Sequence, residues 1–189
     1  MLKYLLGTFA AVAIIIVIIL SNASVTPSIL INSMFGTGID TPASETIQAK
    51  LKLPHGFPIG VYAANVANAR MLEFSEEGDL IVAQPREGKV TLLTRDANSD
   101  GVSDGRRVLL ENLNRPHSID FHDGYLYVAE STAIGRIRFN QLMGTTTGEY
   151  EQIITGLGDV GNHWSKTIRF GPDGLLYLSS GSTCNVCLE

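Results

Sequence analysis

An acidic stretch in the middle of the chain has the composition of a calcium-binding loop. The sequence DANSDGVSDG alternates oxygen-bearing side chains, and Gly101 stands where such loops turn sharply. The expected ligands are Asp96, Asn98, Asp100 and Asp104. Alternation places several oxygens on one concave side, which suits the hard Ca²⁺ ion, although the twelfth position holds Arg107 in place of the closing Glu of an EF-hand. We expect a structural ion that stiffens the loop, and the alternative is a solvated Asp/Asn/Gly turn.

The two cysteines of the chain lie close together in GSTCNVCLE. The spacing of Cys184 and Cys187 is used by redox-active pairs, by half zinc sites and by local disulfides. Zinc requires four ligands and the sequence holds no second cysteine pair, while no thioredoxin-like βαβ pattern surrounds the motif. A structural disulfide is therefore the expected state in an oxidising compartment.

Two histidines stand just before predicted strands. His163 precedes Phe170 by seven residues in GNHWSKTIRFGPDGLLYLSSGS, and an imidazole is a suitable general base because it titrates near neutral pH. The residue types alone favour a hydrogen-bonded loop histidine as the interpretation of His163. His117, in NRPHSIDF, is expected to be packed against its neighbours and not to be catalytic.

The elements that position these residues repeat along the chain. Each repeat has a strand ending in Phe, a short polar turn with Gly, and an apolar strand, and the repeats cover residues 71–84, 118–130 and 167–180. The phenylalanines, Phe74, Phe121 and Phe170, lie 47 and 49 residues apart. Further strands are expected at residues 89–95, 106–113, 135–140 and 149–157. A period of about 40–50 residues with four short strands is typical of β-propeller blades.

The repeats predict an all-β fold, namely an incomplete β-propeller of about two and a half four-stranded blades, preceded by an N-terminal hydrophobic helix. A single blade cannot bury both faces of its sheet, so neighbouring blades must stack around a central channel. Since propellers close with about 4–8 blades, we expect residues 51–189 to be the first blades of a truncated ring. Residues just before an inner strand then lie at the mouth of the channel.

The N-terminal residues have the composition of an export segment. Lys3 precedes an apolar run over residues 4–20, and Ser21-Asn22-Ala23 offers the small residues of a cleavage site. Residues 1–23 are thus a signal peptide or a membrane anchor, and 24–50 a linker rich in Ser, Thr, Pro and Gly. Either alternative predicts a periplasmic or extracellular protein, anchored by residues 4–20 if they are not cleaved. The net charge of −5 excludes non-specific binding of nucleic acid.

The segment from His163 to Tyr177 resembles the third-blade region of the soluble PQQ-dependent glucose and sorbosone dehydrogenases, which are β-propellers. In that family a histidine precedes a strand ending in FGPDG, and the GS-x-C-N-x-C string recurs in the sorbosone type. The resemblance implies that His163 is the general base, taking a proton from a sugar hydroxyl while a hydride passes to PQQ. The glucose enzymes carry an orienting acid before this base, where the present sequence has Asn162. We expect Asn162 and Gln84 to contact the substrate, with strand capping as the alternative for Gln84.

The sequence therefore predicts an oxidoreductase acting on a sugar or another small molecule, with an electron acceptor that reoxidises PQQ. In the family the cationic residues that hold PQQ come from later blades, so we expect this chain alone neither to bind PQQ tightly nor to oxidise sugar. One alternative is a non-enzymatic binding or scaffold propeller. A propeller lactonase is another, with only Asn162 and Glu130 available as metal ligands. Nicotinamide, ATP and serine-hydrolase motifs are absent from the sequence.

Overall fold

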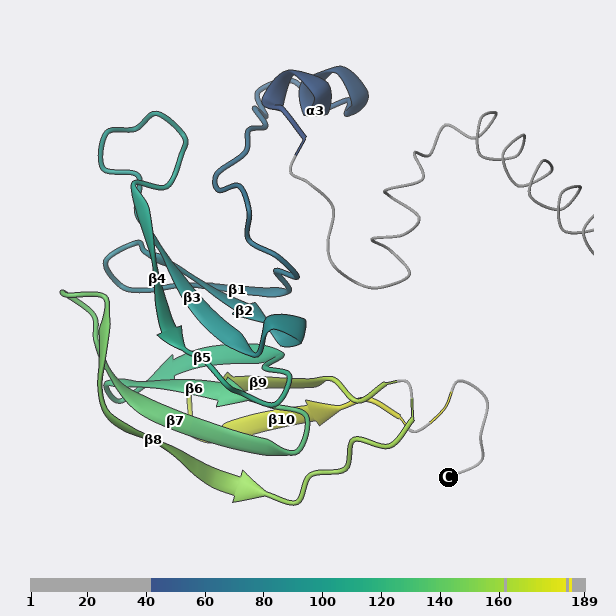
Figure 1. Cartoon of the computed structure of the whole chain (residues 1–189), viewed down its shortest axis with the longest axis vertical. Coiled ribbons are helices and arrows are strands. Elements are labelled where there is room, and N and C mark those ends of the chain that lie inside the picture. Colours follow the sequence, from purple (N-terminus) through teal and green to yellow (C-terminus); the bar gives the residue numbers. More distant parts are fainter. Residues whose placement is uncertain (1–41, 162, 183, 185–189) are drawn as a thin grey trace, which may run out of the picture. The chain divides into compact units, whose positions relative to one another are not determined.

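The computed structural model describes residues 42–161, 163–182 and 184 (Figure 1). The described residues belong to one compact unit, residues 41–189. The predicted N-terminal helix and export segment lie outside the described residues. Within the described part, no helix combines the length and apolar character needed to cross a membrane. A short exposed helix, α3 (Ser44–Lys50), occupies the end of the predicted linker. Its Glu45 and Lys50 suit the positive and negative ends of a helix dipole.

Three antiparallel sheets follow in sequence order (Figure 1). The first contains β1 (Met71–Phe74), β2 (Leu80–Gln84), β3 (Lys89–Thr94) and β4 (Gly105–Leu110). The second contains β5 (Ser118–His122), β6 (Tyr125–Ala129), β7 (Ala133–Asn140) and β8 (Thr145–Thr155). The third pairs β9 (Lys166–Phe170) with β10 (Leu176–Ser180). The predicted all-β fold of two and a half four-stranded blades is confirmed. One difference is that β8 begins four residues before the expected strand.

The hairpin turns use the glycines that the repeats predict. Gly78, Gly124 and Gly174 have φ values of 88°, 75° and 76°. This left-handed region is open to glycine without steric cost, and it lets two strands reverse in a short connection. The repeated glycine therefore fixes where each inner hairpin turns.

Side chains alternate between two cores along each central strand. On β2, Ile81 and Ala83 pack with Leu126 of β6, so the first and second sheets share one core. Leu80 and Val82 point the other way, against Tyr62 and its neighbours before β1. Burying one such side chain is worth about 1.5–3 kcal/mol. Because both faces are covered, every residue of β2 is buried.

The third sheet is covered on one face only. Ile168 packs on the second sheet with Tyr127 and Ala129. Tyr177 of β10 is 56% exposed, whereas Ile81, at the same place in the first repeat, is fully buried. Within the described part of the chain, β10 pairs with β9 alone. The sheets therefore stack as in an open propeller and do not close into a ring.

The inner strands β5 and β9 lie side by side and run in the same direction. The Ile168 backbone N–H donates to Ser118 Oγ at 3.2 Å, and that of Phe170 donates to Asp120 Oδ2 at 2.6 Å. Arg169 extends the link, because its guanidinium contacts Asp120 at 3.1 Å and also Glu73 of β1. These ties bring the beginnings of the inner strands together, and the candidate site lies there.

Candidate functional site

The imidazole of His163 is held in one tautomer by the backbone. His163 lies half-buried just before β9, and its Nδ1 is 3.2 Å from the carbonyl oxygen of Ser182. Ser182 Oγ is 3.3 Å from the same nitrogen, and its own proton is donated to the Cys184 carbonyl at 2.9 Å. Both Ser182 oxygens therefore accept from Nδ1, which carries the proton, and Nε2 keeps its lone pair. No described residue forms a hydrogen bond or ion pair with Nε2. The ring is therefore oriented to accept a proton at Nε2.

Gly181 and Ser182, which follow β10, were not predicted as site residues. The Gly181 N–H donates to Ser165 O at 3.2 Å, and a Cβ on Gly181 would overlap the carbonyl oxygen of His163. Only glycine allows so close an approach, which brings Ser182 to the imidazole. The GSTCNVC motif indicated that this segment was of interest, but the sequence led to a prediction for its cysteines alone and not for Gly181 or Ser182. Cys184 is disulfide-bonded, and Cys187 lies outside the described residues.

Trp164 connects the segment of His163 to the second blade. Its ring lies 4.2 Å from that of His117 at an interplanar angle of 60°, and Arg115 stacks over it at 4.5 Å. Arg115 also forms an ion pair with Asp159 at 3.5 Å. The predicted packing of His117 is confirmed, and through Trp164 it fixes the residue next to the candidate base.

At the strand beginnings, the cations Arg70 and Lys166 lie near a buried histidine. His117 is 2% exposed, and burial, with the nearby cations Arg70 and Lys166, lowers its pKa to about 4. Lys166 is also 2% exposed, and its Nζ donates to the carbonyls of Gly158 at 2.7 Å and Trp164 at 3.0 Å. A histidine and a lysine are thus buried together at the mouth of the sheets.

A family model described as TrAA12-like matches residues 51–189 of the chain. The chain belongs to the TrAA12-like family. No curated protein matches it.

Solved structures resemble the TrAA12-like blades in fold. The PQQ domain of pyranose dehydrogenase from Coprinopsis cinerea aligns with a TM-score of 0.63 and 21% identity, over 71% of this chain and 33% of that one. A Trichoderma reesei structure of Carbohydrate-Active Enzymes Family AA12, titled as an iodide structure, aligns with a TM-score of 0.56 and 18% identity, over 71% and 37%. The corresponding calcium structure aligns with a TM-score of 0.54 and 19% identity, over 62% and 30%. The TrAA12-like chain thus spans about a third of the length of these solved structures.

The structure describes only one of the two residues that were predicted to contact the substrate of the TrAA12-like chain. Asn162 lies outside the described residues. Gln84 is buried, its Nε2 donates to Ala67 O at 2.7 Å, and its Oε1 accepts from Thr91 Oγ1 at 2.6 Å. The amide therefore ties β2 to β3 and to the segment before β1, as in the strand-capping alternative. Contact of Gln84 with substrate stays a prediction.

The predicted calcium loop is closed by its own hydrogen bonds. Asp96 accepts from the backbone N–H groups of Asp100 at 3.1 Å and Gly101 at 2.7 Å, and Asp104 accepts from that of Ala97 at 2.9 Å. Asn98 Oδ1 also accepts from the Asp100 N–H, at 2.9 Å. Among the described residues, no three acidic, histidine or cysteine side chains are placed to hold a metal ion. The loop gathers the expected donors, but their oxygens face backbone amides and do not form a coordination shell.

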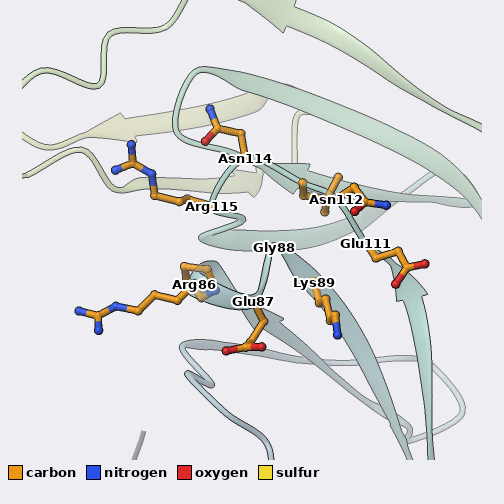
Figure 2. Close-up of a pocket in the computed structure, with 10 residues that line it drawn as sticks. Arg86, Glu87, Gly88, Lys89, Glu111, Asn112, Asn114 and Arg115 are labelled. Atoms are coloured by element: carbon orange, nitrogen blue, oxygen red, sulfur yellow. The ribbon is translucent and has the colours of Figure 1, made fainter. Parts of the chain in front are cut away.

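A surface pocket of about 630 Å³ lies beside the candidate site, between the turn that follows β2 and the connection from β4 to β5 (Figure 2). It includes the short 3₁₀ helix η1 (Pro85–Glu87). Its charged lining residues are Arg86, Glu87, Lys89, Glu111 and Arg115. His163 does not line this pocket, whereas Arg115 belongs to it and also stacks on Trp164. The mixed charge distinguishes the pocket from the basic strand beginnings next to it.

Glu130, the carboxylate that the lactonase alternative requires as a metal ligand, is already hydrogen-bonded to residues in and next to the second sheet. Glu130 is buried, and it accepts from the Asn114 N–H at 2.5 Å, from the Tyr150 hydroxyl at 3.0 Å and from Gln152 Nε2 at 3.1 Å. Burial and the nearby Glu130 charge raise the pKa of Tyr150, so the hydroxyl stays a donor. The contacts of Glu130 are those of a structural residue.

Proposed function

We propose that residues 51–189 form the first blades of a PQQ-dependent dehydrogenase that oxidises a hydroxyl group of a sugar. The observation that carries the proposal is the contact between His163 Nδ1 and the carbonyl of Ser182. It leaves Nε2 as a proton acceptor at the mouth of the inner strands, where propellers bind their ligands. The names of the solved structures, a pyranose dehydrogenase PQQ domain and Family AA12, support a sugar-oxidising function.

In the proposed reaction, His163 Nε2 accepts the proton of the sugar hydroxyl as the C–H bond at the same carbon breaks. PQQ, when bound, supplies the acceptor for the hydride. The Ser182 carbonyl stabilises the imidazolium that forms, because it accepts the hydrogen bond from Nδ1 in both protonation states. Trp164 and Gly181 hold the ring in place from the two neighbouring segments. The carbonyl thus takes the orienting role that an acid has in the glucose enzymes.

The residues at the strand beginnings fit a polyanionic cofactor such as PQQ. The ring nitrogens of His117 are buried and have no hydrogen-bond partner in the structure. Lys166 is buried without a carboxylate partner among the described residues. Both side chains are suited to an acidic ligand.

Export completes the proposal. We infer that residues 4–20 direct the chain out of the cytoplasm, to the periplasm or beyond the cell. The disulfide of Cys184 supports this location, because disulfides persist in oxidising compartments. We also retain a structural calcium ion at residues 96–104, which the acidic composition of that loop supports.

The proposed function is tested by replacing His163→Ala in the complete propeller that carries these blades. Since general-base catalysis contributes about 10²–10⁴-fold, we expect a loss of that size in PQQ-dependent dye reduction with sugar. The melting temperature should not change, and added imidazole should restore part of the rate. His55→Ala is the matched control, because His55 is exposed in the segment before β1. A loss below about threefold would refute the role of His163.

A further inference from the structure

Three basic residues occupy the same position in the three repeats. Arg70, His117 and Lys166 each lie four residues before the phenylalanine of their repeat. They stand at the beginnings of β1, β5 and β9, and the central one, His117, is within electrostatic reach of the other two. The repeat thus gathers three basic groups from three blades at one end of the inner strands. We call them the basic cluster.

His117 is the first sign that the basic cluster receives a ligand. Its side chain is 2% exposed, yet neither Nδ1 nor Nε2 has a hydrogen-bond partner in the structure. Buried polar groups are nearly always paired, because an unpaired one keeps the whole cost of losing water. The Trp164 ring packs against the imidazole in an edge-type contact, with the ring centroids 4.2 Å apart. A ligand with acceptor oxygens would complete the hydrogen bonding of the imidazole.

Lys166 is a second and independent sign. Its Nζ donates to two backbone carbonyls, which leaves the third N–H of an ammonium group unassigned. Carbonyls do not compensate a full charge, and none of the ion pairs among the described residues includes Lys166. The nearby Asp159 is paired with Arg115. Buried ammonium groups are normally balanced by an anion, so this site lacks one negative charge.

We propose that Arg70, His117 and Lys166 bind a carboxylate group of an organic ligand. The imidazole and the ammonium each present an N–H to one carboxylate oxygen, and Arg70, which is exposed, supplies attraction at the rim. A carboxylate matches this small number of donors better than a phosphate, whose additional oxygens would stay unpaired beside the buried strands. Identification of the ligand as PQQ, a tricarboxylate, rests on the proposed function, whereas the carboxylate site itself does not.

Binding can be followed by fluorescence, because Trp164 is the only tryptophan of the chain and contacts His117. The purified chain is titrated with isophthalate, an aromatic dicarboxylate, and with isophthalamide, its neutral analogue. We expect a saturable change with isophthalate alone. Arg70→Gln and Lys166→Met should each raise the dissociation constant for isophthalate about tenfold or more. A loss of affinity of this size is typical when a charge-assisted contact is removed. Lys89→Gln is the matched control, since Lys89 lines the separate pocket in Figure 2.

Each result decides the proposal. Unchanged affinity of Arg70→Gln and Lys166→Met overturns it, as does equal binding of isophthalamide or tighter binding of inorganic phosphate. Arg70 is exposed, so its variant reports on binding even if the buried Lys166 variant does not fold. A change in the ¹⁵N resonances of the His117 ring on adding isophthalate should accompany binding. If isophthalate binds but PQQ does not compete with it in the complete propeller that carries these blades, the carboxylate site stands and the proposed function loses its cofactor.

Discussion

Acid should destabilise the fold through His117, and replacing this residue should remove the effect. In the folded chain, burial and the cations Arg70 and Lys166 lower the pKa of His117 from about 6.5 to about 4. Between these two values the unfolded chain binds a proton at this position and the folded chain does not. Acidification therefore favours unfolding. Stability from this group is complete above about pH 6.5 and is lost as the pH falls to about 4.

The size of the effect follows from the pKa difference. One pKa unit corresponds to about 1.4 kcal/mol, so His117 accounts for a loss of at most about 3 kcal/mol between pH 7 and pH 4. Such a loss is a large part of the about 5–15 kcal/mol that stabilises an ordinary domain. His117→Gln keeps a polar side chain but does not titrate, and its stability should fall less over the same interval.

Urea unfolding measured at steps from pH 7 to pH 4 tests this reasoning, with circular dichroism as the signal. The carboxylates titrate in both proteins, so the difference between the two curves isolates His117. His55→Gln is the control, because His55 is exposed, and its curve should run parallel to that of the wild type. If the His117→Gln curve also runs parallel to the wild type, the low pKa and its cause in burial are wrong.

Two further predictions concern the loops around the site. Gly181→Ala should destabilise the fold by about 2 kcal/mol or more in urea unfolding, because its Cβ would overlap the His163 carbonyl oxygen, while Gly158→Ala, where a Cβ meets no atom within 4 Å, should be nearly neutral. Equal stability of the two variants would contradict the close approach. Millimolar Ca²⁺ should raise the melting temperature of the wild type and not of Asp100→Asn, with Mg²⁺ as the control ion. No response to Ca²⁺ would show that hydrogen bonds alone close the loop.

Most of the fold could be predicted because its cause is local and repeats. The glycines with positive φ and the alternating apolar residues recur in each hairpin, so they indicate both the turns and the two faces of the sheets. The strand β8 was predicted too short, because its first residues, Thr145–Gly148, carry no apolar alternation. These residues become a strand because they pair with β7. That pairing depends on the neighbouring strand and not on the sequence of the segment itself. Helix α3 was missed for a similar reason, since none of its residues is buried and no apolar period marks it.

The candidate site was predictable only in part. His163 was found through its resemblance to a family motif, whereas Ser182 and Gly181 act on it from the end of another strand. Their role depends on the pairing of β9 with β10, which places residues 163 and 181 next to each other. The orphaned nitrogens of His117 could not be foreseen either. Packing against its neighbours was the expected outcome for His117, and the lack of a hydrogen-bond partner depends on the full set of those neighbours.

The basic cluster and the candidate base, His163, are connected by direct contacts. Lys166 Nζ donates to the carbonyl of Trp164, the residue directly after His163, and the Trp164 ring packs on His117. A carboxylate drawn to Lys166 and His117 would thus act on the two groups that hold the backbone next to the base. Binding at the basic cluster should then restrict the imidazole of His163 before any sugar is present. The segment from His163 to Lys166 would then hold both the proton acceptor, His163, and a residue that binds the cofactor, Lys166. Binding of the cofactor would thus place the hydride acceptor and the proton acceptor together.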